Sequence, residues 1–271
     1  MSNRKRYQQF LTYLNKSKTR HPELVELLVF YEQLSCEQDE FVSGLDKNSF
    51  PVDHNLKFSR LTEGIPQFTF EELLIGREDF VRLSIRMADF ITEYFPYFKD
   101  GGEVMTDEDM LKIAQTIFNS RNPVVLSDTL LNLTSLTAGL SLIPYIQRAC
   151  DAIVARIPQD AWRRPYCPVC GGKPFFAALD NESGARSLLC SRCNAEWIYG
   201  RIGCPFCEST EKQLYYLSED GQYRLYVCDV CRCYIKTIDL RQTGRDVHLP
   251  IECIVTVSMD IAAQEKGYRH Y

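Results

Sequence analysis

The chain has 271 residues, of which 12 are cysteines, and it carries a formal net charge of −5 at pH 7. This length allows one large domain or two smaller ones. Hydrophobic residues make up 45% of the chain, which is ordinary for a globular protein and argues against extensive disorder.

The N-terminal part of the chain carries helical periodicity. The first twenty residues are basic, but no apolar segment follows them, so we expect no secretory signal. Apolar side chains at i, i+3, i+4 and i+7 predict amphipathic helices over residues 21–36 and 77–97. Between them, residues 41–68 contain glycine and proline without a sustained period, which predicts an irregular connection.

Two more helices are expected before the composition changes. A third helix begins at Thr106, where Thr-x-x-Asp approximates a capping box. A fourth begins near Pro123, and its apolar pattern continues beyond Pro144. Its apolar tract, residues 129–143, is interrupted by polar residues and is too short to span a membrane, so we expect it to be buried. These patterns predict an all-helical domain over residues 1–162.

After Pro158 and Pro165 the pattern changes from helices to short strands. Strand-like runs separated by turn residues lie at 173–179 and 186–189, and again at 213–217 and 223–227. Each pair of runs predicts one β-hairpin. A last helical pattern over residues 250–268 ends at Gly267, a residue that favours helix termination.

The β part of the chain contains an internal repeat of cysteines. Four Cys-x-x-Cys pairs lie there: Cys167/Cys170, Cys190/Cys193, Cys204/Cys207 and Cys228/Cys231. The first two pairs are separated by 19 residues and the last two by 20. Two such pairs across a hairpin place four sulfur atoms around one cation, so each half predicts one complete four-thiolate metal site. A site that combines the second pair with the third fits the same spacing.

A site closed by four cysteines most often stabilises a small domain that lacks a large core. It has no open coordination position, which argues against metal-assisted hydrolysis. Redox-active iron of the rubredoxin type and dithiol exchange are the alternatives. Zinc and iron both suit four thiolates, so the ligands alone do not choose the metal.

The remaining cysteines and the histidines carry weaker signals. Cys233 is a spare ligand, a reactive thiol or a free surface or half-buried cysteine. Cys36, Cys150 and Cys253 fall in apolar helical patterns, where core packing is expected. None of the four histidines lies within a cysteine pair, and we expect no histidine ligand. The chain carries no phosphate loop, dinucleotide fingerprint or catalytic triad pattern, so we expect no catalytic residue and no enzyme activity.

Charge divides unevenly along the chain. Residues 21–162 carry 23 acidic and 11 basic side chains, a local balance of −12, whereas residues 163–241 are close to neutral at +2. The acidic helical part would attract a basic peptide, or it serves solubility. A nucleic-acid-binding zinc ribbon needs a basic stripe, which the cysteine region lacks, although four tyrosines of the second hairpin could stack on bases. Paired cysteines without an export signal favour a reducing, cytoplasmic location.

The cysteine region resembles a known family. The resemblance is carried by Cys167-Pro-Val-Cys-Gly-Gly, Arg186-x3-Cys190-x2-Cys193-x2-Glu196-Trp197, Arg201-x2-Cys204-x2-Cys207, Cys228-x2-Cys231-x2-Tyr234-x-Lys236 and the closing Asp260-x4-Glu265-x-Gly267-Tyr268. These motifs are similar to the tandem rubredoxin-like region of the formate dehydrogenase accessory protein FdhE family. The chain departs from that pattern at Arg232, where glycine is usual, and in the extra thiol of Cys233.

The resemblance implies an α+β fold in which an all-helical N-terminal domain precedes tandem rubredoxin-like or zinc-ribbon β-hairpin modules and a C-terminal helix. We expect the modules over residues 163–203 and 204–241, with residues 242–271 packing back on them. It implies a cytoplasmic, non-catalytic maturation factor or chaperone that binds the catalytic subunit of respiratory formate dehydrogenase before export. It also implies that the eight paired cysteines hold iron in two sites, with zinc as the alternative.

Overall fold

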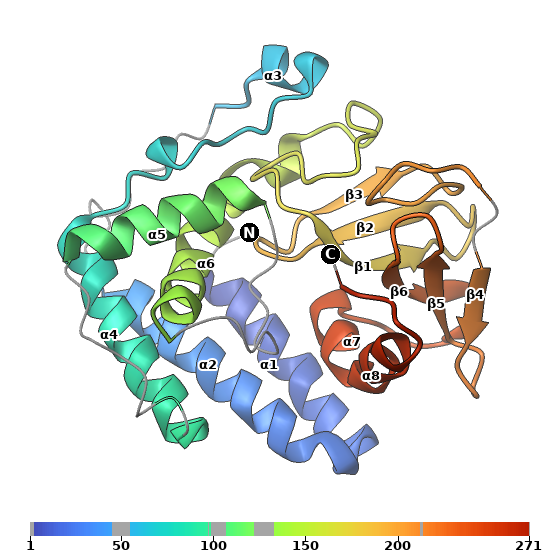
Figure 1. The fold of residues 1–271 in the computed structure, drawn as a ribbon, viewed down its shortest axis with the longest axis horizontal. Coiled ribbons are helices and arrows are strands. Elements are labelled where there is room, and N and C mark those ends of the chain that lie inside the picture. The colour runs from blue at the N-terminus through green and yellow to red at the C-terminus, as the bar shows by residue number, and fades with distance from the viewer. Residues whose placement is uncertain are drawn as a thin grey trace.

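A layer of helices packs beside a six-stranded sheet in the computed structural model of the chain (Figure 1). The structure describes residues 3–44, 55–96, 98, 107–121, 133–211 and 214–270. The helical part contains α1 (Asn3–Arg20), α2 (Val25–Gly44), α3 (Phe58–Glu63), α4 (Arg77–Tyr94), α5 (Asp107–Ser120) and α6 (Leu133–Ile153). No helix within the described residues is long and apolar enough to cross a membrane.

Helices α4 and α6 form the centre of the helical core. The predicted apolar face of α4 is buried, with Leu83, Met87 and Ile91 each fully enclosed. Helix α6 continues through Pro144, as its apolar pattern predicted. Proline has no backbone N–H, so the carbonyl of Leu140 loses its helical partner. The Gln38 side chain on α2 donates to that carbonyl over 2.9 Å and thereby ties α2 to α6.

Two helical segments lie outside the sequence-based expectations. Helix α1 forms from the basic first twenty residues and packs on α2, where Leu14 and Leu28 are fully buried. The short helix α3 lies within the stretch expected to be irregular. Conversely, Thr106 and the start of the fourth expected helix near Pro123 lie outside the described residues.

The sheet has the strand order β3-β2-β1-β6-β5-β4. Its strands are β1 (Pro174–Leu179), β2 (Arg186–Cys190), β3 (Glu196–Tyr199), β4 (Leu214–Leu217), β5 (Tyr223–Cys228) and β6 (Cys233–Asp239). The four expected strands correspond to β1, β2, β4 and β5. Each half also contributes a third strand, β3 or β6, after its second cysteine pair, and the sequence pattern did not predict these two.

Strand β6 joins the two halves into one sheet. It pairs in parallel with β1, from Phe176 opposite Lys236 to Leu179 opposite Asp239, whereas the other neighbouring strands pair antiparallel. All seven residues of β6 are buried, so the strand lacks the alternation of a half-exposed strand. Its two charged residues are paired: Lys236 donates to Asp260 over 2.6 Å, and Asp239 accepts from Arg224 and Arg241. Hydrogen bonding to Arg241 and Arg224 lowers the pKa of Asp239 to about 2.

The C-terminal segment forms two short helices where one was expected. They are α7 (Leu249–Val255) and α8 (Val257–Glu265), and the chain bends between them at Thr256. Helix α7 packs on β1 and on α1, so it connects the sheet to the helical part (Figure 1). The Lys236 ammonium stabilises this corner, because it also donates to the Cys253 carbonyl over 2.8 Å. Gly267 takes a left-handed conformation with φ of 77° after α8, as its helix-stop role predicted.

Candidate metal centres

The structure brings the eight paired cysteines into two groups of four. Cys167, Cys170, Cys190 and Cys193 form the first group, and Cys204, Cys207, Cys228 and Cys231 form the second. Within each group the four sulfur atoms lie within 4.8 Å of one another. Each group joins the two pairs of one half, so the alternative that combines the second pair with the third does not occur. Both groups could hold a metal ion.

The first group has the spacing of a tetrahedral thiolate site. The sulfur of Cys170 lies 3.5 Å from that of Cys190 and 3.7 Å from that of Cys193, and Cys167 Sγ lies 3.6 Å from Cys193 Sγ. Four sulfurs about 2.3 Å from a central ion would be about 3.8 Å apart, which is close to the observed values. The backbone amides of Val169 and Arg192 point at the sulfurs of Cys167 and Cys190. The residues therefore fit a metal ion without rearrangement.

The second group has similar spacing and greater exposure. Cys204 Sγ lies 3.6 Å from Cys231 Sγ, and Cys207 Sγ lies 3.7 Å from Cys228 Sγ. All four cysteines of the first group are at most 3% exposed, whereas Cys207 is exposed and Cys231 is partly exposed. Solvent or a partner can therefore reach the second group from the side of Cys207.

All four cysteine pairs use the same tight turn. The residue after the second cysteine of each pair takes a left-handed conformation, with φ of 71° at Gly171, 58° at Asn194, 59° at Glu208 and 57° at Arg232. Glycine tolerates this conformation and asparagine accepts it readily. Glu208 and Arg232 are less suited, yet they adopt it as well. Arg232 gains compensating contacts, because its guanidinium lies over the Tyr268 ring and donates to the Lys266 carbonyl over 3.0 Å.

Burial of the sulfur atoms affects whether the cysteines are thiols or metal-bound thiolates. Burial raises the pKa of the Cys167 and Cys204 thiols, because a thiolate loses its hydration there. A bound metal ion reverses this effect and holds coordinating thiols in the deprotonated form. Each group is thus suited either to four neutral thiols or to four thiolates around a metal.

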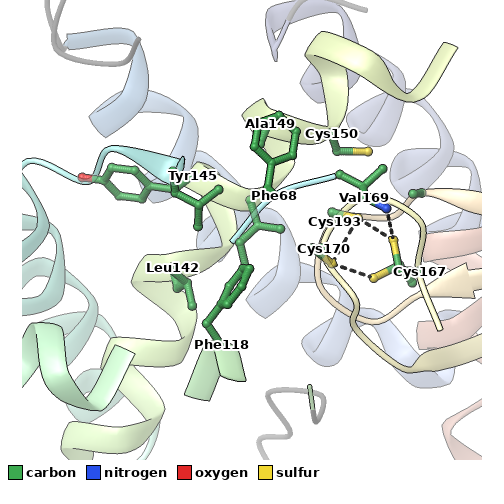
Figure 2. Packing of buried hydrophobic residues seen from close by; sticks show 14 of the residues in the cluster. Phe68, Phe118, Leu142, Tyr145, Ala149, Cys150, Cys167, Val169, Cys170 and Cys193 are labelled. Carbon is green, nitrogen blue, oxygen red and sulfur yellow. Dashed lines mark hydrogen bonds between the residues drawn. The ribbon is translucent and has the colours of Figure 1, made fainter. Parts of the chain in front are cut away.

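The first group is part of the main hydrophobic core. Figure 2 shows Val169 beside the cysteines, with Phe68 and Phe118 of the same cluster on the side of the helices. The side chain of Arg192 is buried beside the sulfurs and donates to the carbonyls of Ile117 and Phe118, at 2.7 Å each, in the last turn of α5. The amide of Phe68 donates to the Val169 carbonyl over 3.0 Å. The first group therefore connects the helical part to the sheet.

Other cysteines lie outside the two groups of four. Cys233 is buried, and its sulfur donates to the Cys231 carbonyl over 3.5 Å rather than joining the second group. Cys150 and Cys253 are buried in the core, as expected, and Cys150 lies next to Cys193. Cys36 differs from the expectation, because it is partly exposed and its sulfur lies 3.5 Å from a Glu40 carboxylate oxygen.

Arginine and tyrosine side chains near the hairpins have mainly structural contacts. Arg186 donates to the Gly200 and Gly203 carbonyls, and Arg224 donates to Asp239, so both side chains hold neighbouring segments of the hairpins together. The expected base-stacking face is incomplete: Tyr223 is buried, and its hydroxyl donates to Glu252 over 2.5 Å. Only Tyr215 and Tyr216 of the four tyrosines are exposed.

Comparison with known proteins identifies relatives over nearly the whole chain. A family model described as "FdhE, central domain" matches residues 166–201. A protein named FdhE homolog from Aquifex aeolicus is 29% identical over 260 residues, which cover 93% of this chain and 88% of that protein. Shorter matches to an FdhE homolog from Pseudomonas aeruginosa (34% identical) and to FdhE from Escherichia coli O127:H6 (29% identical) each cover 39% of this chain. They cover 37% and 35% of those proteins.

A solved structure shares the fold. The crystal structure of the FdhE protein from Pseudomonas aeruginosa superimposes with a TM-score of 0.63 at 19% sequence identity. The match covers 98% of this chain and 92% of that chain, so it includes both the helical part and the sheet with its cysteine groups.

Proposed function

We propose that the chain is a member of the FdhE family and that it acts as an accessory factor for respiratory formate dehydrogenase. In this role it binds the catalytic subunit of the dehydrogenase in the cytoplasm, before that subunit is exported. The observation that carries the proposal is the combination of full-length similarity to FdhE proteins with two groups of four cysteines.

We propose that all eight paired cysteines are metal ligands and that both sites hold iron. The sulfur spacing and the all-cysteine ligand set support a tetrahedral site, and the resemblance to rubredoxin-like modules favours iron over zinc. Four protein ligands leave no open position for a substrate or a water molecule, which supports a non-catalytic role. The metals would then shape the surface that the partner meets.

The proposed location follows from the state of the thiols. All 12 cysteines are free of disulfides, including those whose sulfur atoms lie close together. Reduced cysteine pairs are typical of a cytosol that keeps thiols reduced. We therefore propose that the protein acts in the cytoplasm, where a dehydrogenase subunit is available before export.

We propose a separate role for each segment of the chain, with one metal-binding module for each half of the cysteine repeat. Residues 1–162 would supply an acidic, helical partner surface, residues 163–203 and 204–241 would be two metal-binding modules, and residues 242–271 would pack back on them. The exposure of Cys207 favours a second candidate role for the second module, in which its iron exchanges electrons with a partner as rubredoxin does.

We expect the second site to be needed for maturation of the dehydrogenase. Replacing Cys204 and Cys207 by serine removes half of its ligands, and the exposed surface around it should lose its shape. The measurement is capture of the catalytic subunit by tagged wild-type or variant protein, together with dehydrogenase activity in cells that carry each form. Cys36→Ser is a matched control outside both groups. Unchanged capture and unchanged activity in the double variant would exclude the second site from the function.

A further inference from the structure

A large cavity lies between the helices and the sheet. It has a volume of about 820 Å³, and its walls come from α1, α2 and α6 on one side and from β1, β2, β3 and α7 on the other. Figure 1 shows these elements facing one another around the N-terminal half of α1. The volume falls in the upper part of the range typical of ligand sites, which is about 300–1,000 Å³.

The cavity exists because the sheet carries small side chains at this place. Ala178 on β1 lies opposite Ser187 on β2, and Ser187 lies opposite Ile198 on β3, so these residues form one row across the sheet. The next row on the same face begins with Phe176 and Leu189, which are large and pack in one cluster with α7. The change from large to small residues leaves the space above Ser187 unfilled.

Several polar groups of the wall lack partners. Arg6 and Asp151 form an ion pair across the cavity wall, yet Arg6 Nη1 and Asp151 Oδ2 are buried and bond to no described residue. Nδ1 of His248, another wall residue, is also buried and bonds to no described residue. Buried polar atoms are rarely left without a partner, and these three atoms belong to residues that line the cavity. The wall of the cavity is therefore polar as well as acidic.

The charge of the wall favours a cationic ligand. Among the described residues that line it, the acidic ones are Asp39, Asp151, Asp180 and Glu196, and the basic ones are Arg6 and His248. Burial lowers the pKa of His248 to about 4, so this histidine is neutral at pH 7. Among the described residues, Glu196 has no ion-pair partner, and its side chain is exposed at the edge of the cavity.

The cavity continues into a groove along the edge of the sheet. A smaller hollow of about 270 Å³ shares Ser187, Glu196 and Ile198 with the cavity and reaches Trp162. Three consecutive residues of β3 line this hollow, and β3 pairs only with β2 among the described strands. Its outer backbone edge therefore has no strand partner among the described residues. Unpaired strand edges bind extended peptides by adding a strand.

We propose that this cavity and groove bind an extended peptide segment of a protein partner, with an arginine or lysine side chain of the segment paired to Glu196. The basic side chain balances the acidic wall, and the peptide backbone extends along the edge of β3. The proposed function supplies only one part of this inference, namely that the partner is a protein. The site itself is inferred from the cavity and does not depend on the proposed function.

The test measures binding of defined probes to the full chain. The probe is a short fluorescein-labelled peptide in which arginine alternates with alanine, and the matched probe carries glutamate in place of arginine. Unlabelled spermine, a small polycation, competes in a third arm. Fluorescence anisotropy gives the dissociation constants at low and moderate salt, and circular dichroism confirms that each variant is folded.

Two variants and one control separate the outcomes. We expect Glu196→Gln to weaken binding of the arginine peptide about tenfold, because the charge pair between Glu196 and the peptide is lost. Ser187→Leu fills the cavity and should weaken binding at least as much. Glu182→Gln, on the exposed turn between β1 and β2, should leave binding unchanged.

The proposal is wrong if wild-type protein does not bind the arginine peptide, or if both variants bind it as wild type does. The proposal is also wrong if the glutamate peptide binds as tightly as the arginine peptide, or if an equal concentration of spermine displaces the arginine peptide. Capture of the dehydrogenase subunit by the Glu196→Gln variant is a separate readout. If the Glu196→Gln variant loses peptide binding but still captures the subunit, the accessory function stands and the cavity serves another partner. If wild-type protein binds the arginine peptide but does not capture the subunit, the accessory function is refuted and the cavity site stands.

Discussion

Replacing Cys167 and Cys170 by serine is expected to abolish cooperative folding of the chain. These residues supply half of the first metal site, which is at most 3% exposed and belongs to the main hydrophobic core. Binding of a structural metal by four such ligands contributes about 10–16 kcal/mol. The whole stability of a typical domain is about 5–15 kcal/mol, so loss of this site exceeds what the remaining core can supply.

The second site provides the control for this expectation. Cys204→Ser with Cys207→Ser removes the same number of ligands from a site that is partly exposed and whose cysteines are not part of the main hydrophobic core. We expect this variant to keep helical circular dichroism and a cooperative thermal transition, while the first-site variant loses the transition or is recovered only as aggregate. Equal melting temperatures for the first-site variant and wild type would show that the first site does not stabilise the fold.

Replacing Arg192 by methionine is expected to destabilise the protein by about 3 kcal/mol. The guanidinium donates to two carbonyls in the last turn of α5, and hydrogen bonds from a charged group contribute about 1.5–3 kcal/mol each. Methionine restores much of the buried volume, so the loss reports mainly on the missing hydrogen bonds. A positive charge near four thiolates is lost as well, which should weaken metal binding at the first site.

Urea denaturation monitored by circular dichroism measures this effect. The matched control is Arg201→Met, since Arg201 is exposed and lies in the loop after β3. We expect the midpoint of Arg192→Met to fall clearly below that of wild type and the control to stay within about 0.5 kcal/mol of wild type. If both variants unfold at the same urea concentration as wild type, Arg192 does not link α5 to the sheet in solution.

Local periodicity predicted most of the helical part. Apolar spacing located α4 within a few residues, because one face of that helix is buried along its whole length. Helix α1 was not predicted, since its basic composition dominates the sequence pattern. Its burial comes from Leu14, which packs against residues of α7 more than 200 positions away. That contact depends on tertiary structure and leaves no local signal.

The metal sites were more predictable than the sheet that holds them. Cysteine spacing alone located both groups, because ligand geometry restricts the distance along the chain. Strands β3 and β6 were missed because they follow the second cysteine pairs, and β6 is buried on both faces, with Lys236 and Asp239 in it. The charge of these residues argues against a buried strand unless their partners on distant segments are known.

The cavity could not have been predicted from the sequence. Nothing in the strand patterns marks Ala178, Ser187 or Glu196 as residues of a site. Only the strand register and the packing of the sheet place them beside α1 and α6. Arg6 and Asp151 are 145 positions apart, and neither lies in a motif. Long-range packing, rather than residue type, creates this site.

Metal analysis of protein purified without air tests the central claim most directly. We expect two equivalents of iron per chain in the wild type and one equivalent in the variant with Cys204→Ser and Cys207→Ser. The absorption of ferric thiolate should bleach reversibly on reduction. A wild-type protein that contains no stoichiometric metal, or the same metal content in the variant as in the wild type, would contradict the assignment of two four-cysteine metal sites.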